Sequence, residues 1–62
     1  MPPKVIRNMA IISTEAQARG LDFTGEIDSG KNWVAGLCKR PNETFVWVGF
    51  DFETSQYYEK EN

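Results

Sequence analysis

Histidine is absent from this 62-residue sequence, and cysteine occurs only once, as Cys38. A single thiol cannot close a disulfide within the chain, and a classical zinc site of cysteine and histidine ligands is disfavoured. Without histidine, the chain also lacks the side chain that most often transfers protons near neutral pH. We therefore expect no enzymatic activity, no metal and no cofactor. The lone thiol favours a reducing compartment, and we expect a cytoplasmic protein.

Long apolar runs are also missing from the sequence. No segment approaches the roughly 20 apolar residues that cross a bilayer, and the charged residues Lys4 and Arg7 interrupt any signal-peptide pattern near Met1. We interpret the sequence as a complete small reading frame that forms one soluble domain over residues 1–62. A domain of this size buries only about 60% of the surface that its unfolded chain exposes, so its stability is marginal without association.

Charge is small overall but unevenly distributed. The net charge is −2, with six basic and four acidic side chains in residues 1–42 and one basic and five acidic side chains in residues 43–62. Aromatic residues are interleaved with the acidic ones near this end of the chain: Phe50, Phe52, Tyr57 and Tyr58. Proteins that bind nucleic-acid backbones draw most of their affinity from Lys and Arg, so the acidic balance argues against general nucleic-acid binding.

A β-hairpin is predicted around a type I turn at Arg40–Glu43, because Pro41 and Asn42 suit the two central positions of such a turn. Closing the hairpin directly at this turn predicts the cross-strand pairs Leu37–Val46, Trp33–Phe50, Ala35–Val48 and Lys39–Thr44. In this register one face of the hairpin collects Trp33, Ala35, Leu37, Val46, Val48 and Phe50. The opposite face collects Val34, Gly36, Cys38, Phe45, Trp47 and Gly49. We expect the first of these faces to form the core.

The rest of the pattern predicts a small α+β domain with an antiparallel sheet. Strands are expected near residues 4–12, 21–27, 32–39 and 44–52, with one short helix near residues 14–19. Thr14 and Gln17 have the spacing of a capping box at the start of this helix, and Gly20 suits the position just after its end. Gly25 interrupts the alternation of its strand, which is typical of a β-bulge or of a close-packed aromatic ring.

Two segments leave alternatives open. The apolar residues of 4–12 fit a buried helix as well as a strand, although their β-branched side chains favour the strand. Residues 56–60 could form a helical turn, a short edge strand or a disordered segment. If they closed the sheet as a further strand, the chain would form an SH3-like small β-barrel, which is the alternative fold.

Both predicted hairpin faces are apolar, and so short a chain has little material to cover two faces, which favours an interaction surface. Trp47 is the central candidate, since the predicted register places it opposite Gly36, where its ring would cover the glycine. Acidic groups would steer the chain toward a basic surface, and aromatic rings would anchor it there. We therefore expect these residues to bind the partner: Trp47, Phe45, Asp51, Glu53, Tyr57, Tyr58 and Glu59.

The predicted function is that of a non-enzymatic small binding protein that acts by protein–protein interaction. Small acidic proteins without catalytic groups are common among phage and mobile-element genes, where they inhibit a larger host protein or a nucleic-acid-processing complex. A homodimer is a further expectation, because a second copy could cover the apolar patch. The alternative is a small single-stranded nucleic-acid-binding protein that uses Trp33 or Trp47 on an aromatic sheet face, with Lys31, Lys39 and Arg40 nearby. No membrane partner is expected.

Overall fold

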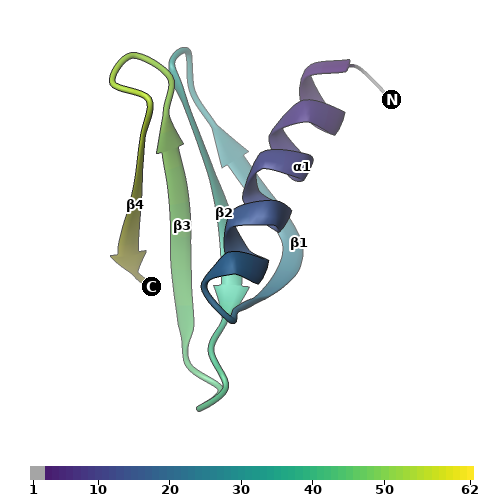
Figure 1. The fold of residues 1–62 in the computed structure, drawn as a ribbon, viewed down its shortest axis with the longest axis vertical. Coiled ribbons are helices and arrows are strands. Elements are labelled where there is room, and N and C mark those ends of the chain that lie inside the picture. The colour runs from purple at the N-terminus through teal and green to yellow at the C-terminus, as the bar shows by residue number, and fades with distance from the viewer. Residues whose placement is uncertain (1–2) are drawn as a thin grey trace.

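The computed structural model describes residues 3–62, which form one helix followed by four strands (Figure 1). The helix α1 spans Pro3–Ala18, and the strands are β1 (Asp22–Ser29), β2 (Trp33–Lys39), β3 (Phe45–Asp51) and β4 (Gln56–Glu61). All neighbouring strands are antiparallel, and their order in the sheet is β1-β2-β3-β4. The predicted α+β class is confirmed. The sheet is open, with β1 and β4 as its edges, so the alternative of a closed SH3-like barrel is wrong.

The predicted strand at residues 4–12 is wrong, because these residues belong to α1. The short helix expected near residues 14–19 is only the last part of this 16-residue helix. Ile12 and Ala16 lie one turn apart on α1 and are both fully buried against the sheet. Packing of this stripe outweighs the β-branched preference of the segment, which is a weak signal by comparison.

The end of α1 follows the predicted pattern. Gly20 has a φ of 72°, and the Leu21 amide donates to the Ala16 carbonyl at 2.8 Å while the Gly20 amide donates to the Gln17 carbonyl at 3.1 Å. These two hydrogen bonds form a Schellman motif, which needs a residue with positive φ at this position. By contrast, Thr14 lies inside the helix and does not cap its start.

The predicted hairpin register is wrong by one residue. The turn itself forms, since the Glu43 amide donates to the Arg40 carbonyl at 2.9 Å. However, Glu43 then has a φ of 70°, and the Arg40 amide donates to the Thr44 carbonyl at 2.8 Å. A type I turn followed by one left-handed residue gives a three-residue loop, because a bare type I turn does not match the twist of the strands. Leu37 therefore pairs with Trp47.

This shift changes which residues of β2 enter the core. Val46 and Val48 of β3 are buried, as predicted, but their neighbours in β2 are Cys38 and Gly36. The predicted core residues Trp33, Ala35 and Leu37 lie on the opposite face instead. The buried cluster consists of Ile12, Ala16, Val34, Cys38, Val46 and Val48, with Ile11, Leu21, Phe23, Ile27, Phe50 and Phe52 packed against it. A one-residue shift necessarily has this effect, because successive side chains of a strand point to opposite faces.

The predicted irregularity at Gly25 is confirmed as a β-bulge. Phe23 pairs with Cys38 and Ile27 with Gly36, so β1 has two more residues than β2 over this interval. Gly25 has a φ of 93°, which glycine adopts at little cost. The bulge lets both Phe23 and Ile27 face the core.

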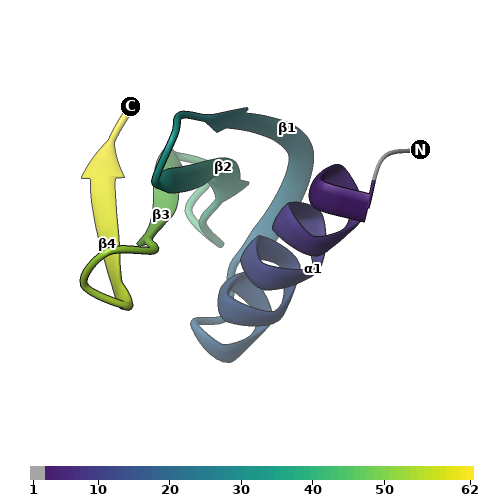
Figure 2. The ribbon, with the colours of Figure 1, turned by 90° about the horizontal axis from the view of Figure 1, so that it is seen from above.

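The helix covers only part of the sheet. It contacts β1, β2 and β3, and within residues 3–62 it makes no close contact with β4. Figure 2 shows α1 on one side of the sheet near β1 and β2, with β4 farthest from it. Residues 56–61, left open by the sequence, form β4, and all six are exposed. The molecule thus has an inner face partly covered by α1 and an outer face that no other element covers within the described residues.

Candidate functional site

The outer face of the sheet is the larger candidate site. The strand pairing places Leu37 beside Trp47, Ala35 beside Gly49, and Gly49 beside Tyr58. Aromatic residues occur on all three of the strands β2, β3 and β4: Trp33, Phe45, Trp47 and Tyr58. Trp33 is 37% exposed, Phe45 40% and Tyr58 39%. Four large rings distributed over one face that no described element covers are typical of a surface that partners bind.

A hollow of about 430 Å³ lies within this outer face. Its wall residues come from all four strands and the chain end: Asp28, Ala35, Trp47, Tyr58, Lys60, Glu61 and Asn62. The Trp47 indole N–H donates to Asn62 Oδ1 at 3.1 Å, which fixes the orientation of the ring. The Tyr58 ring lies over Gly49, where an added Cβ would collide with it. The predicted cover of a glycine by an aromatic ring thus occurs at Tyr58 and Gly49.

Gly36, which was expected beneath Trp47, has a different role. It pairs with Val48 and faces the helix, where a Cβ would meet the side chains of Ile12 and Phe23. The glycine allows α1 to approach the sheet closely. The predicted contact between Trp47 and Gly36 is therefore wrong, and Trp47 lies beside Leu37 instead.

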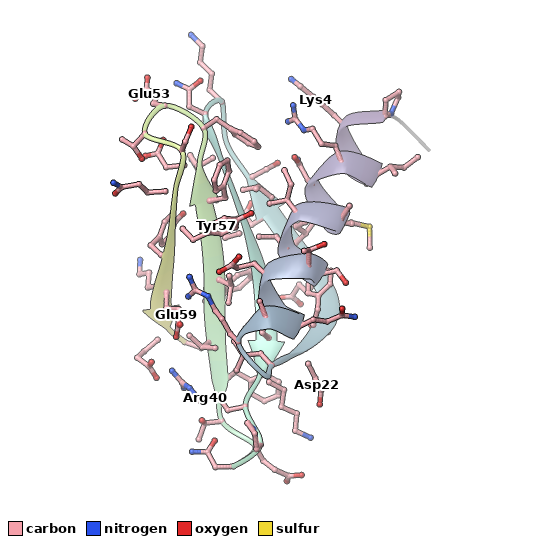
Figure 3. The ribbon with its side chains drawn as sticks, in the orientation of Figure 1. Lys4, Asp22, Arg40, Glu53, Tyr57 and Glu59 are labelled. Atoms are coloured by element: carbon pink, nitrogen blue, oxygen red, sulfur yellow. The ribbon has the colours of Figure 1, made fainter. Side chains whose placement is uncertain are left out.

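Asp51 is the last residue of β3, beside Trp33, and Glu53 lies in the turn between β3 and β4. The Asp51 carboxylate accepts hydrogen bonds from the Glu53 amide at 2.8 Å and the Thr54 amide at 3.4 Å. Glu53 accepts a hydrogen bond from the Asn32 side-chain amide at 3.1 Å. Asp51 therefore organises this turn, which Figure 3 shows at the far end of the sheet from Arg40.

Tyr57 and Glu59 lie on the inner face, the side of the sheet on which α1 packs (Figure 3). The Tyr57 ring lies 4.6 Å from the Phe50 ring, centroid to centroid. Glu59 Oε2 accepts a hydrogen bond from Arg19 Nη1 at 2.6 Å, and Arg19 Nε also donates to Glu15 at 2.8 Å. The Glu15 hydrogen bond is the main cause that raises the pKa of Arg19, and Glu59 adds to it. This ion-pair network holds β4 to the end of α1.

The predicted binding residues are thus divided among three places. Phe45, Trp47, Tyr58 and Asp51 share the outer face, whereas Glu53 lies in the β3–β4 turn and Tyr57 and Glu59 lie on the inner face. Sequence reasoning missed Trp33 and Leu37 as members of the outer face, because the shifted register assigned them to the core. It also missed Asp28 and Lys60, which the correct register would have placed beside Ala35 and Trp47.

Chemically reactive groups are few in the described part of the chain. Cys38 is fully buried, and burial raises the pKa of its thiol. Residues 3–62 contain no group of three or more histidine, cysteine, aspartate or glutamate side chains placed to hold a metal ion. The one helix of this region is too short and too polar to cross a membrane.

The fold and the outer face define a small α+β protein with an uncovered aromatic sheet surface. Comparison with known proteins finds no protein family, no curated protein and no solved structure that matches the chain. Its function must therefore be argued from its own surface.

Proposed function

We propose that this chain is a non-enzymatic binding protein that attaches to a larger protein through the outer face of its sheet. The observation that carries the proposal is that Trp33, Phe45, Trp47 and Tyr58 share one face that the described elements leave uncovered. Aromatic residues are enriched among the side chains that dominate binding energies at protein interfaces. The proposed mechanism is steric, in that the bound protein occupies a surface that its target needs for its own activity.

The size of the molecule suits such an interface. Its two longest dimensions, 31 and 26 Å, include both the sheet and the helix that lies beside it in Figure 1. Stable protein complexes bury roughly 800 Å² on each partner, which is on the order of one face of this domain.

The charge distribution supports a basic target surface. Asp22 and Asp28 pair with residues of β2 on the outer side, and within residues 3–62 neither carboxylate forms an ion pair. By contrast, Glu59 and Glu61 are paired with Arg19 and Arg40. The carboxylates of β1, rather than those of β4, are then the groups that steer the chain toward a basic partner. A phage or mobile-element inhibitor acting in the cytoplasm is the form of this function that we propose.

Two adjacent tyrosines of β4 give a matched test. Tyr58 is 39% exposed on the outer face, and Tyr57 is 38% exposed on the inner face. A tagged chain is used to purify its partner from the native cell, and the captured protein is then purified and its affinity measured for each variant. We expect Tyr58→Ala to weaken binding by about tenfold or more and Tyr57→Ala to leave it nearly unchanged. Equal losses from both variants would contradict an outer-face interface.

A second candidate function, binding of single-stranded nucleic acid, is favoured by the same four aromatic rings, on which bases could stack. Reversing the charges of Asp22 and Glu26 separates the two functions, because both residues are exposed on β1. With a basic protein target, the Asp22→Lys/Glu26→Lys variant should associate more slowly. With an oligonucleotide, the same variant should bind more tightly, since phosphates would lose two repulsive neighbours. A variant that weakens binding to the target protein and leaves oligonucleotide binding undetectable supports the protein interface.

A further inference from the structure

We infer that the hollow in the outer face receives an arginine side chain of the partner, with its guanidinium group against Asp28. This inference rests on the proposed function and specifies the chemistry that the basic target must present. The geometry that carries it is an open hollow with two aromatic walls and one carboxylate that has no cationic partner within the described residues.

The aromatic walls favour a cation. Trp47 and Tyr58 both line the hollow, where the Trp47 indole N–H donates to Asn62 Oδ1 and the Tyr58 ring lies over Gly49. The faces of aromatic rings carry partial negative charge and attract Arg and Lys side chains. The hollow, at about 430 Å³, is within the range of sites that bind small ligands, so it can accept a long side chain.

Asp28 supplies the matching charge. Its Oδ1 accepts a hydrogen bond from the Ser29 amide at 2.9 Å, and the side chain remains exposed at the rim of the hollow. Its position beside Ala35, which also lines the hollow, places it on the outer face. A carboxylate oxygen with free lone pairs can therefore accept hydrogen bonds from an incoming guanidinium group.

Lys60 lies across the hollow from Asp28. It lines the hollow from β4, whereas Asp28 lies in β1, three strand spacings or roughly 14 Å across the sheet. Glu61 lines the hollow at the same end as Lys60 but is paired with Arg40, so Asp28 is the lining carboxylate that has no cationic partner within the described residues.

Arginine fits this arrangement better than lysine does. Its planar guanidinium group can stack on an aromatic face and at the same time donate two parallel hydrogen bonds to a carboxylate. A lysine ammonium group is a strongly hydrated point charge and lacks this flat stacking surface. Trp47, Tyr58 and Asp28 together present the stacking surfaces and the acceptor that arginine uses.

The test uses a small probe, acetyl-glycyl-arginyl-glycinamide, and its citrulline counterpart, which has nearly the same shape but no charge. Binding is followed by NMR through the indole N–H signal of Trp47. We expect saturable binding of the arginine peptide at millimolar concentration and binding of the citrulline peptide at least about fivefold weaker. Similar binding of the two peptides would overturn the inference, as would the absence of saturable binding of the arginine peptide.

Matched protein variants locate the site. Asp28→Asn removes the charge in the hollow, whereas Glu43→Gln removes a charge of the same sign in the β2–β3 loop, outside the hollow. Asp28→Asn should reduce arginine-peptide binding to the citrulline level, and Glu43→Gln should leave it unchanged. Equal effects of the two variants would mean that the peptide senses only overall charge, and the inference would fail.

Failure of the arginine inference and failure of the proposed function give different experimental results. If the arginine peptide shows no preference for the wild-type hollow but Tyr58→Ala still abolishes binding to the purified target, the interface stands and the arginine inference is wrong. If the peptide binds as expected while Tyr57→Ala and Tyr58→Ala weaken target binding equally, the hollow recognises arginine and the proposed function is wrong.

Discussion

Cys38 is a residue whose chemistry is set by its place in the core. Its side chain is fully buried, and its Sγ lies 3.6 Å from the Gly36 carbonyl oxygen. Burial is the main cause that raises the pKa of the thiol, with a smaller contribution from the charge of Glu59. Because the thiolate is the reactive form, both the raised pKa and the burial make Cys38 a packing residue rather than a nucleophile.

We therefore expect the Cys38 thiol to react very slowly with a thiol reagent in the folded protein. A buried thiol becomes accessible only when the structure opens, so the rate should be about 1,000-fold or more below that of a free cysteine peptide at the same pH. Reaction followed by absorbance with a chromogenic disulfide, with and without urea, measures the difference. A native rate within about tenfold of the peptide rate would contradict this packing role.

The Arg40–Glu61 pair ties the loop between β2 and β3 to the end of β4. Arg40 Nη1 donates to Glu61 Oε1 at 3.0 Å, and its Nη2 contacts the other carboxylate oxygen, so the pairing is bidentate. The hydrogen bond from Arg40 is the main cause that lowers the pKa of Glu61. Because the folded state favours the ionised carboxylate, this contribution to stability is present above the ordinary glutamate pKa and is lost as the pH falls through the lowered value.

An NMR titration of the side-chain carboxyl groups tests this pairing. Glu61 should titrate below the ordinary range for glutamate, and Arg40→Gln should return its pKa upward. Lys39→Gln is the matched control, because Lys39 is the neighbouring cation and pairs with Glu43 instead. A Glu61 titration that responds equally to both substitutions would show that overall charge, and not the Arg40 contact, lowers its pKa.

At the scale of elements, the β2–β3 loop shows where sequence reasoning stopped. Pro41 and Asn42 correctly predicted the turn, but no residue preference predicts that Glu43 takes a left-handed conformation. The whole pairing of β2 with β3 depends on that one conformation. Residues of β3 were nevertheless assigned to the correct face, because their own alternation is independent of the loop.

Glu43 should be replaceable by glycine with a gain in stability. A non-glycine residue at a φ of 70° costs on the order of 1 kcal/mol, and Glu43→Gly removes this strain. The substitution also removes the Lys39–Glu43 ion pair, which is exposed and contributes little. Urea unfolding should show a gain of up to about 1 kcal/mol. Glu53→Gly, in the other tight turn, is the control and should give no gain, since Glu53 has no positive φ.

The contact between α1 and the sheet was beyond sequence reasoning for a different reason. Gly36 was correctly placed within a strand, but its role depends on Ile12 of α1 and Phe23 of β1, which lie far from it in the sequence. The assignment of residues 4–12 to a strand made this contact impossible to foresee. Local signals did predict the end of α1 at Gly20 and the bulge at Gly25, because both depend only on neighbouring residues.

A pair of glycine substitutions tests this packing. In Gly36→Ala the new Cβ would meet Ile12 and would lie 2.7 Å from Phe23 Cε1, and neither side chain has room to move within the core. We expect a loss of about 1–3 kcal/mol in the free energy of unfolding. In Gly49→Ala the colliding group is the exposed Tyr58 ring, which can turn toward solvent, so the loss should be smaller. Equal losses in urea unfolding would mean that α1 does not pack tightly on Gly36.

At the scale of the whole molecule, the sequence predicted an apolar surplus but not its location. The two apolar faces of the hairpin are real, and α1 covers the face that contains Val46 and Val48. Trp47 and Phe45, two of the predicted partner-binding residues, lie on the opposite face, which no described element covers. Tyr57 and Tyr58 were grouped as neighbours in sequence, but the alternation of β4 separates them, so only tertiary structure could divide the candidate set.

The charges of the outer face suit a two-fold dimer, and we expect the free protein to self-associate through this face. Acidic residues lie on β1 and Lys60 lies on β4, so a two-fold axis along the strands brings the acidic edge of one copy over Lys60 of the other. Sedimentation at roughly tens of micromolar should then give a mass near twice 7.1 kDa. Tyr58→Ala should shift the protein toward the monomer, whereas Tyr57→Ala should not.

We expect self-association and target binding to compete for the outer face, so that dimerisation lowers the concentration of monomer that can bind the target. Raising the concentration of the chain should weaken its apparent affinity for the purified target per monomer, because a second copy must leave before the target binds.

Tyr58→Ala cannot separate self-association from target binding, since it weakens both. Lys60→Glu can, because it places like charges opposite the acidic β1 edge of the second copy while favouring a basic target. We expect this variant to be monomeric and to bind its target at least as tightly as the wild type. A Lys60→Glu variant that remains dimeric would show that the two copies meet elsewhere, and the outer face would then be free for the target at all concentrations.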